Sequence, residues 1–175
     1  MVKTYTFDDV VNGLNQVAPY DWRGFWSARL TSHGPGAPLG GIEGSGWKVA
    51  YDDNRSEMMR AWEDRHTELN ASYSVGLVLK EDGTIEDTIE GMDAARAGIG
   101  PGMKVVAVNG RRFNFQVFRD ALWAGKNSSQ PLQLLVENTD YFRTVSLNYH
   151  GGEKYPHLVR DESRPDMLTD IIRAH

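Results

Sequence analysis

The stretch from residue 89 to residue 110 constrains the fold more than any other part of the chain. It reads Ile-Glu-Gly-Met-Asp-Ala-Ala-Arg-Ala-Gly-Ile-Gly-Pro-Gly-Met-Lys-Val-Val-Ala-Val-Asn-Gly. The small residues of Asp93–Gly98 favour a one-turn helix that lies close to a sheet, and Gly98 and Gly102 can adopt backbone angles that other residues resist. Residues 103–108 have the apolar character of a buried strand, and Asn109-Gly110 is typical of a tight turn.

Strand and turn signals continue on both sides of this stretch. Asp82-Gly83 is a strong hairpin sequence. Alternating or branched apolar residues predict strands over 47–51, 73–79, 84–89, 132–137 and 142–147, the last two joined at 138–140. Helical spacing predicts one helix over 55–69, with Met58, Met59, Trp62 and Leu69 on one side, and a second helix that Asn114 caps.

The two ends of the chain differ in texture from this central part. Thr6 and Asp21 are positioned to cap two N-terminal helices, the second with Trp22, Phe25 and Trp26 along one side. These helices are too small to bury their apolar residues alone, so they need a further surface. A Gly- and Pro-rich loop follows, and a polar tail ends in a short helix over 166–173. We therefore expect a helical segment with a loop over 1–45, a central domain over 46–150 and a tail over 151–175 that packs on that domain.

Composition excludes several kinds of protein. The chain of 175 residues has no cysteine, which excludes disulfide scaffolds, thiolate zinc sites, iron–sulfur clusters and thiol nucleophiles. A net charge of −5 argues against a broad nucleic-acid surface. No stretch approaches the roughly 20 apolar residues that span a bilayer, and the first residues lack the apolar core of a signal peptide. We expect a soluble chain without membrane insertion, and its compartment stays open.

Motifs for catalysis or metal binding are not found. The five histidines, His33, His66, His150, His157 and His175, never have the His-x-x-x-His spacing of a zinc helix. The sequence His66-Thr67-Glu68 has the His-x-Glu of zinc deaminases without their cysteines, and no serine lies in a Gly-x-Ser-x-Gly elbow. We therefore predict no catalytic residue, no metal ligand and no cofactor in this chain.

The stretch 89–110 resembles the central signature of bacterial PDZ domains, in which a strand leads to a small-residue helix, Ala-Gly, Pro-Gly and a buried strand ending in Asn-Gly. Met92-Asp93 stands where the family usually has Ser-Pro, and Met103 where it has Asp. The resemblance implies an α+β fold: a PDZ-like, partly open barrel or sandwich of five or six strands capped by two helices, here with a helical N-terminal extension and a C-terminal tail.

The resemblance also implies a groove that binds a peptide by strand addition. The loop at Ser74, Val75, Gly76 and Leu77 would hold a peptide carboxylate with its backbone amides, and the peptide would lie beside residues 77–79. The opposite wall would be the helix that follows Asn114. The predicted peptide-binding residues are Ser74, Val75, Gly76, Leu77, Val78, Leu79, Phe115, Phe118, Arg119 and Leu122. For any one of these side chains, a place in the core is about as good an interpretation.

A second resemblance covers almost the whole chain in order. Residues 14–26, Gly46-Trp47-Lys48-Val49, 73–77 and the tail sequence Tyr155-Pro156-His157-Leu158-Val159-Arg160 are similar to the C-terminal part of the glycyl aminopeptidase family of zinc metallopeptidases. In that family a thermolysin-like catalytic domain precedes a PDZ domain. The resemblance implies that residues 5–30 are the last helices of such a domain, and that zinc belongs only to that part of the parent protein.

Two functions follow as hypotheses. In the first, the domain binds a peptide or protein C-terminus or an extended segment and is not an enzyme by itself. In the second, the groove is blocked, by the 55–69 helix or the 151–175 tail, and the domain is a structural or regulatory support for the parent's own catalytic domain.

Overall fold

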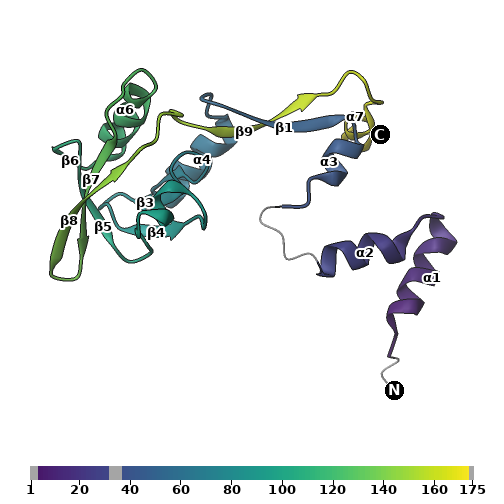
Figure 1. The fold of residues 1–175 in the computed structure, drawn as a ribbon. Helices are drawn as coiled ribbons and strands as arrows, with labels where there is room; N and C mark the ends of the chain where they lie inside the picture. The colour runs from purple at the N-terminus through teal and green to yellow at the C-terminus, as the bar shows by residue number, and fades with distance from the viewer. Residues whose placement is uncertain (1–3, 32–36, 174–175) are drawn as a thin grey trace. The chain divides into compact units, whose positions relative to one another are not determined.

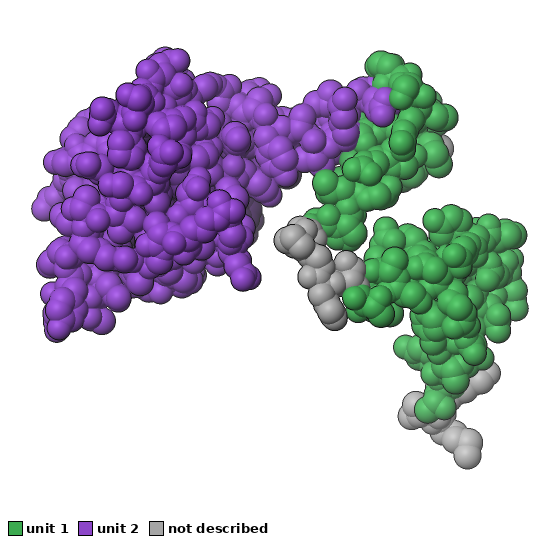
Figure 2. Space-filling model, viewed as in Figure 1, with its two compact units in different colours: residues 1–47, 162–175 green, residues 48–161 purple. Residues whose placement is uncertain are grey.

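The computed structural model describes residues 4–31 and 37–173. The chain forms two compact units, residues 48–161 and residues 1–47 with 162–175 (Figure 2). The predicted limits of the central domain, 46 and 150, stay a prediction; the larger unit extends eleven residues further, to 161, and the helical unit takes in residues 162–175 of the predicted tail.

The larger unit contains open antiparallel sheets (Figure 1). A three-stranded sheet has the order β2 (Glu68–Ala71), β3 (Leu77–Lys80), β4 (Ile85–Thr88). A four-stranded sheet has the order β6 (Arg111–Arg112), β5 (Lys104–Val108), β7 (Leu132–Asn138), β8 (Tyr141–Leu147). A separate ribbon joins β1 (Trp47–Asp52) to β9 (Tyr155–Arg160). The helices of this unit are α4 (Glu57–His66), α5 (Asp93–Arg96) and α6 (Phe115–Gly125).

One hydrophobic core lies between these elements. Leu77, Val105, Phe118, Leu134 and Val136 are fully buried in it, so both larger sheets and α6 share the same interior. Alternate residues of β7 are buried, as the strand period requires. Burial of this apolar surface is the main force that holds the unit together.

Local signals read from the sequence set the turns and caps of this unit. Asn109 and Gly110 both have positive φ angles, 48° and 76°, as a two-residue turn between β5 and β6 requires. The Asn114 side chain accepts a hydrogen bond from the backbone N–H of Val117 at 2.8 Å and caps α6. Gly83 has φ +90° in the turn that begins with Asp82. These predictions are confirmed.

The smaller unit is helical and buries little. It contains α1 (Phe7–Val17), α2 (Trp22–Thr31), α3 (Gly40–Gly44) and α7 (Met167–Ile172). Thr6 caps α1, as the sequence predicts, and the Asp9 side chain completes a capping box with it. Aromatic rings of Tyr20, Trp22, Phe25 and Trp26 meet edge to face, with centroids 5.2–6.2 Å apart. Near α7, the Trp47 indole N–H donates to Asp166 at 2.9 Å.

The α+β class is confirmed, but the strand pattern is richer than the sequence suggests. The described residues hold nine strands, against the five or six expected, because β2, β6 and β9 were not predicted. The helix predicted over 55–69 ends at His66, where Thr67 takes a left-handed conformation with φ 53°. Residues 73–76, predicted as the start of a strand, form a turn instead.

His33 and His175, named above, lie outside the described residues. None of the helices within residues 4–31 and 37–173 is both long and apolar enough to span a bilayer.

Candidate functional site

The groove predicted from the sequence would lie between β3 and α6. The structure places most of its apolar side chains in the core instead: Val75, Leu77, Leu79 and Phe118 are fully buried, and Leu122 is 3% exposed. Val78 is also buried, and Phe115 packs partly buried against the core. The buried side chains therefore do not line an open cleft, whereas Phe115 and Arg119 line a hollow of about 240 Å³ between α6 and the α4–β2 segment.

The edge of β3 that a peptide would need is occupied by β2. The two strands run antiparallel over four residue pairs, from Glu68 opposite Lys80 to Ala71 opposite Leu77. The other edge of β3 pairs with β4, so β3 is the central strand of its sheet. Leu69 and Ala71 of β2 are 1% and 3% exposed and belong to the same core as Phe118 and Leu122. A strand of the chain itself thus fills the place beside β3.

The turn that joins β2 to β3 folds back onto the end of β2. The backbone N–H groups of Ser74 and Gly76 both donate to the carbonyl oxygen of Ala71, at 3.1 and 3.0 Å. Gly76 has φ +81°, which favours glycine, and a Cβ atom there would collide with the side chain of Met92. The Ser74 hydroxyl oxygen accepts the N–H of Lys154 at 3.0 Å. One of the amides expected to hold a peptide carboxylate, that of Gly76, therefore donates to an oxygen of the chain's own backbone.

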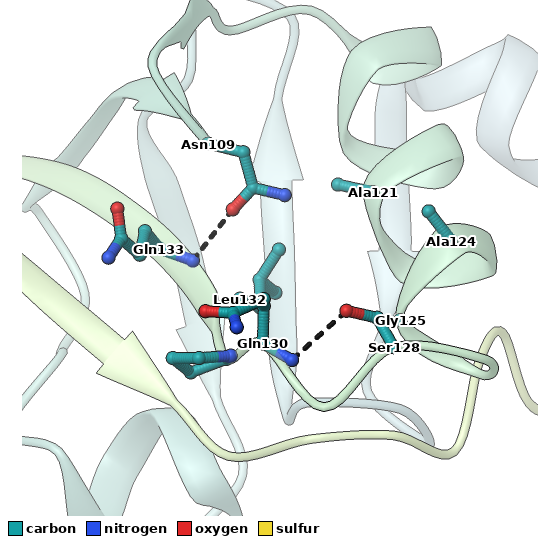
Figure 3. Close-up of a pocket in the computed structure, with 9 residues that line it drawn as sticks. Asn109, Ala121, Ala124, Gly125, Ser128, Gln130, Leu132 and Gln133 are labelled. Atoms are coloured by element: carbon teal, nitrogen blue, oxygen red, sulfur yellow. Dashed lines mark hydrogen bonds between the residues drawn. The ribbon is translucent and has the colours of Figure 1, made fainter.

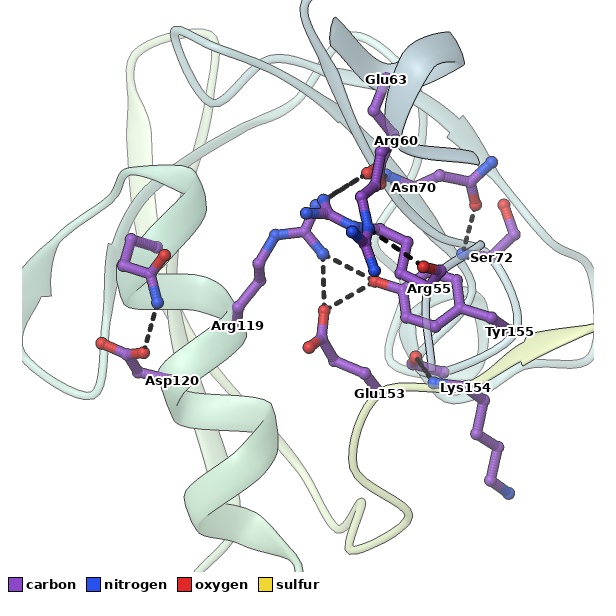
Figure 4. Close-up of polar contacts among 12 residues, drawn as sticks. Arg55, Arg60, Glu63, Asn70, Ser72, Arg119, Asp120, Glu153, Lys154 and Tyr155 are labelled. Atoms are coloured by element: carbon purple, nitrogen blue, oxygen red, sulfur yellow. Dashed lines mark hydrogen bonds and ion pairs between the residues drawn. The ribbon is translucent and has the colours of Figure 1, made fainter. Parts of the chain in front are cut away.

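Arg119 of α6 connects this helix to α4 and to the residues at the start of β9 (Figure 4). Its guanidinium donates to Glu63 of α4 at 3.0 Å, to Glu153 at 2.6 Å and to the Tyr155 hydroxyl at 2.6 Å. The Tyr155 hydroxyl in turn donates to Glu153 at 2.7 Å. Burial by itself would lower the pKa of Arg119, but the neighbouring oxygens of Tyr155, Glu63 and Glu153 outweigh it and raise that pKa above its usual value. We call Arg55, Glu63, Arg119, Glu153 and Tyr155 the Arg119 network.

Glu63 is the most buried charge of this network, with 3% of its side chain exposed. One carboxylate oxygen accepts from both Arg55, at 2.6 Å, and Arg119; the other accepts the backbone N–H of Asn70 at 2.9 Å. Two carboxylates and two guanidinium groups balance in charge, as buried ions require. The Asn70 bond also takes up an amide of β2, so α4 helps to hold β2 in place.

The network contains no group poised for chemistry. Burial and the hydrogen bond to Glu153 raise the pKa of the Tyr155 phenol well above its usual range, so this group keeps its proton. The hydrogen bonds and ion pairs of the network connect the α4–β2 segment to α6 and to the start of β9.

A separate hollow of about 260 Å³ lies between the end of α6 and the start of β7 (Figure 3). Asn109 accepts the backbone N–H of Gln133 at 2.9 Å, and Ser128 accepts that of Gln130 at 3.0 Å. Ala121, Ala124 and Leu132 complete much of its wall. No acidic or basic side chain lines it, so it offers no acid or base for catalysis.

The described residues also contain no set of three or more His, Cys, Asp or Glu side chains that is placed to hold a metal ion. His66, the first residue of the His-Thr-Glu sequence, is exposed; its Nδ1 lies 2.8 Å from the Trp62 carbonyl oxygen and its ring stacks on the Trp62 ring.

Sequence reasoning found Arg119 but missed its partners. Glu63 follows Trp62 in a helix whose apolar side was expected to be the important one, and its burial depends on the meeting of α4 with α6. Glu153 and Tyr155 lie in the region predicted as a polar tail, more than 30 residues away in sequence. Only the tertiary fold brings these groups together.

Comparisons with known proteins give a likeness of fold. No protein-family model and no curated protein matches the sequence. Among solved structures, an aminopeptidase N family protein from Idiomarina loihiensis aligns with 97% of this chain at 17% identity and a TM-score of 0.61; the chain spans 29% of that protein. The HtrA3 PDZ domain bound to a phage-derived ligand aligns over 74% of the chain and all of its own length, at 14% identity and a TM-score of 0.33. At these identities, what this chain shares with the aminopeptidase N family protein is the fold of the aligned part.

Proposed function

We propose that this chain is a non-catalytic part of an aminopeptidase-like protein, in which a PDZ-like domain with a filled groove supports the catalytic domain. The chain is similar in fold to less than a third of an aminopeptidase N family protein, which leaves room for a separate catalytic domain in the parent. The partner in this proposal is the parent's own catalytic domain.

A single observation carries this proposal: β2 pairs with β3 along the edge where a peptide would add. The pairing is reinforced by the burial of Leu69 and Ala71 and by the bond from Asn70 to Glu63. An incoming peptide would have to replace these contacts as well as the backbone hydrogen bonds between β2 and β3. Because β2 belongs to the same chain, its effective concentration beside β3 is high, which favours β2 over a free peptide.

The test is a titration of the whole chain with pentapeptides that end in Val, Leu, Phe or Ala with a free carboxylate, followed by backbone amide shifts. We expect no saturable change at 74–79 or 115–122, because their hydrogen-bonding edge is already used. Saturable shifts confined to those two segments would overturn the proposal of a filled groove.

The second candidate function is peptide binding by strand addition after β2 has left. The hydrogen bonds from the Ser74 and Gly76 amides to the Ala71 carbonyl oxygen favour it. They indicate that these amides are oriented to donate to an oxygen at the end of a neighbouring strand, as a peptide carboxylate would supply. Peptide binding by the residues predicted from the sequence stays a prediction. Saturable amide shifts at 74–79 and 115–122 in the titration above would support it.

We also propose that the chain does not hydrolyse peptides by itself. An assay with alanine and glycine p-nitroanilides, with and without added zinc, should give no turnover above background. Turnover that persists in a chelator, and that follows the purified chain through chromatography, would contradict this proposal.

A further inference from the structure

A second cavity, of about 480 Å³, lies beside the turn that joins β2 to β3. Its walls come from four places in the chain: Tyr51 of β1, Ser72 and Tyr73 of the turn, Ile89 and Met92 before α5, and Lys154 before β9. None of these residues belongs to β3 or α6. The cavity is therefore distinct from the filled groove, and the inference below does not rest on the function proposed above.

Most of the cavity surface is apolar although it faces solvent. Tyr51, Tyr73 and Ile89 are 51%, 40% and 38% exposed, and such large side chains gathered in one hollow are typical of a binding site. The rings of Tyr51 and Tyr73 are tilted to each other with centroids 5.5 Å apart, so their faces do not cover each other. This leaves aromatic surface for a ligand ring or a branched apolar group.

Lys154 supplies the charge of the cavity. Its backbone is fixed by the bond to the Ser74 hydroxyl, and its side chain extends away from the Arg119 network (Figure 4). Across the described ranges its ammonium group has no ion-pair partner, unlike Lys80, Lys104 and Lys126, which each lie near a carboxylate. The nearby Asp93 is directed to Arg96, 3.9 Å away.

We infer that this cavity binds an apolar group that carries a carboxylate, as the C-terminal residue of a peptide or a free aromatic acid does. A cation would be repelled by Lys154, and a neutral apolar molecule would cover the ammonium without giving it a partner, which costs free energy. A carboxylate satisfies the ammonium, while the apolar group contacts Tyr51, Tyr73 and Met92.

The test compares N-acetyl-phenylalanine with N-acetyl-phenylalaninamide, and a pentapeptide ending in Phe with its C-terminal amide, by calorimetry and amide shifts on the whole chain. We expect saturable shifts at Tyr73, Ile89 and Lys154, and affinity for each acid about tenfold or more above that for its amide. Stronger binding of the pentapeptide than of the single residue identifies a peptide end as the source; equal binding identifies a small acid.

Two variants with a matched control complete the test. Lys154→Met keeps the apolar part of the side chain, so it should remove the preference for the acid, and Lys154→Arg should retain it. Lys48→Met changes an exposed lysine of β1 that does not line the cavity, and it should leave all affinities unchanged. Equal binding of acid and amide by the unmodified chain, equal effects of the two methionine variants, or no saturable shift at the cavity residues would each overturn the inference.

Discussion

Arg119 lies on α6 at a position where a groove residue of a PDZ-like domain was expected, but its guanidinium binds partly buried groups of the same chain. Among the described residues its guanidinium donates hydrogen bonds to Glu63, Glu153 and Tyr155, and only 14% of its side chain is exposed. A buried ion of this kind is costly to place and more costly to leave unpaired. Its contribution is therefore to fix which segments meet.

Substitution of Arg119 should show this cost. Arg119→Met leaves Glu63 and Glu153 with one guanidinium instead of two, so we expect the free energy of unfolding to fall by about 3 kcal/mol. Denaturant unfolding followed by circular dichroism measures the change. Lys126→Met, which removes a solvent-exposed pair with Asp53, is the control and should change stability far less. Equal losses in the two variants would mean that the Arg119 network is not a buried, coupled unit.

Tyr155 gives the network a signature at alkaline pH. Its pKa is raised in the fold, above the ordinary value of about 10, so the protonated phenol stabilises the native state and this contribution is complete below that pH. As pH rises past about 10 the unfolded chain loses the proton and the folded chain does not, so stability should fall. Absorbance at 295 nm should show that Tyr155 ionises only on unfolding. Tyr155→Phe should make the delayed step smaller without removing it, because burial also raises the pKa of Tyr149; a single transition near pH 10 in the unmodified chain would refute this.

Among the elements, α4 and β2 are linked as one segment beside β3. Ser56 caps α4 through the N–H of Met59, the left-handed Thr67 ends it, and β2 begins directly afterwards. Glu63 of α4 then accepts the N–H of Asn70 in β2. The helix thereby holds the strand that occupies the edge of β3.

If β2 is integral to the core, truncating it should cost as much as a core substitution. We expect Leu69→Ala to lower the free energy of unfolding by about 2–4 kcal/mol, because this side chain is 1% exposed. Met58→Ala, at a position of α4 that is 76% exposed, should have little effect. Native-state hydrogen exchange gives an independent measurement: β2 amides should open only with β3. Exchange of β2 at a much lower free energy than β3 would favour a displaceable strand and the second candidate function.

The turn between β2 and β3 depends on Gly76 for two reasons, and a second glycine separates them. Gly76 and Gly91 both have positive φ, 81° and 77°, but only at Gly76 would a Cβ meet another group, the side chain of Met92. Gly76→Ala should therefore destabilise the chain by about 1–3 kcal/mol more than Gly91→Ala, as overpacking does. Thermal and denaturant unfolding of the two variants measure the difference. Equal losses would show that the φ angle alone sets the requirement at Gly76.

At the level of the whole molecule, the two units differ in how they are stabilised. Residues 48–161 contain the continuous core, whereas α1 buries only Val11 and α2 buries no side chain. The aromatic side chains Trp22, Phe25 and Trp26 contact one another rather than a core. An amphipathic helix pair of this kind derives most of its stability from a surface against which it can pack.

Hydrogen exchange should reveal this difference directly. Amides of α1 and α2 should exchange by local opening at low free energy, while those of β3, β5 and β7 should require global unfolding. A chain limited to residues 46–161 should then keep the exchange pattern of its sheets. Slow exchange in α1 and α2, equal to that of the sheets, would mean that these helices have a stable core of their own.

The sequence by itself determined the local features of this protein. The capping residues Thr6 and Asn114, the turn at Asn109-Gly110 and the hairpin β7–β8 were all predicted, because each depends on neighbours a few residues away. Helical periodicity misplaced Leu69, since a residue seven positions after Trp62 lies on the same side of a helix; a left-handed Thr67 ended that helix first.

Only the tertiary structure decided which strand lies beside β3. The sequence of residues 74–79 does not indicate whether their amides and side chains contact a ligand or other parts of the chain. In the structure, the pairing of Ala71 with Leu77 places β2 beside β3. The partners of Arg119, at positions 63, 153 and 155, meet it through contacts that no local pattern encodes. A strand edge is defined by what lies beside it, and that neighbour is chosen by the packing of the whole core.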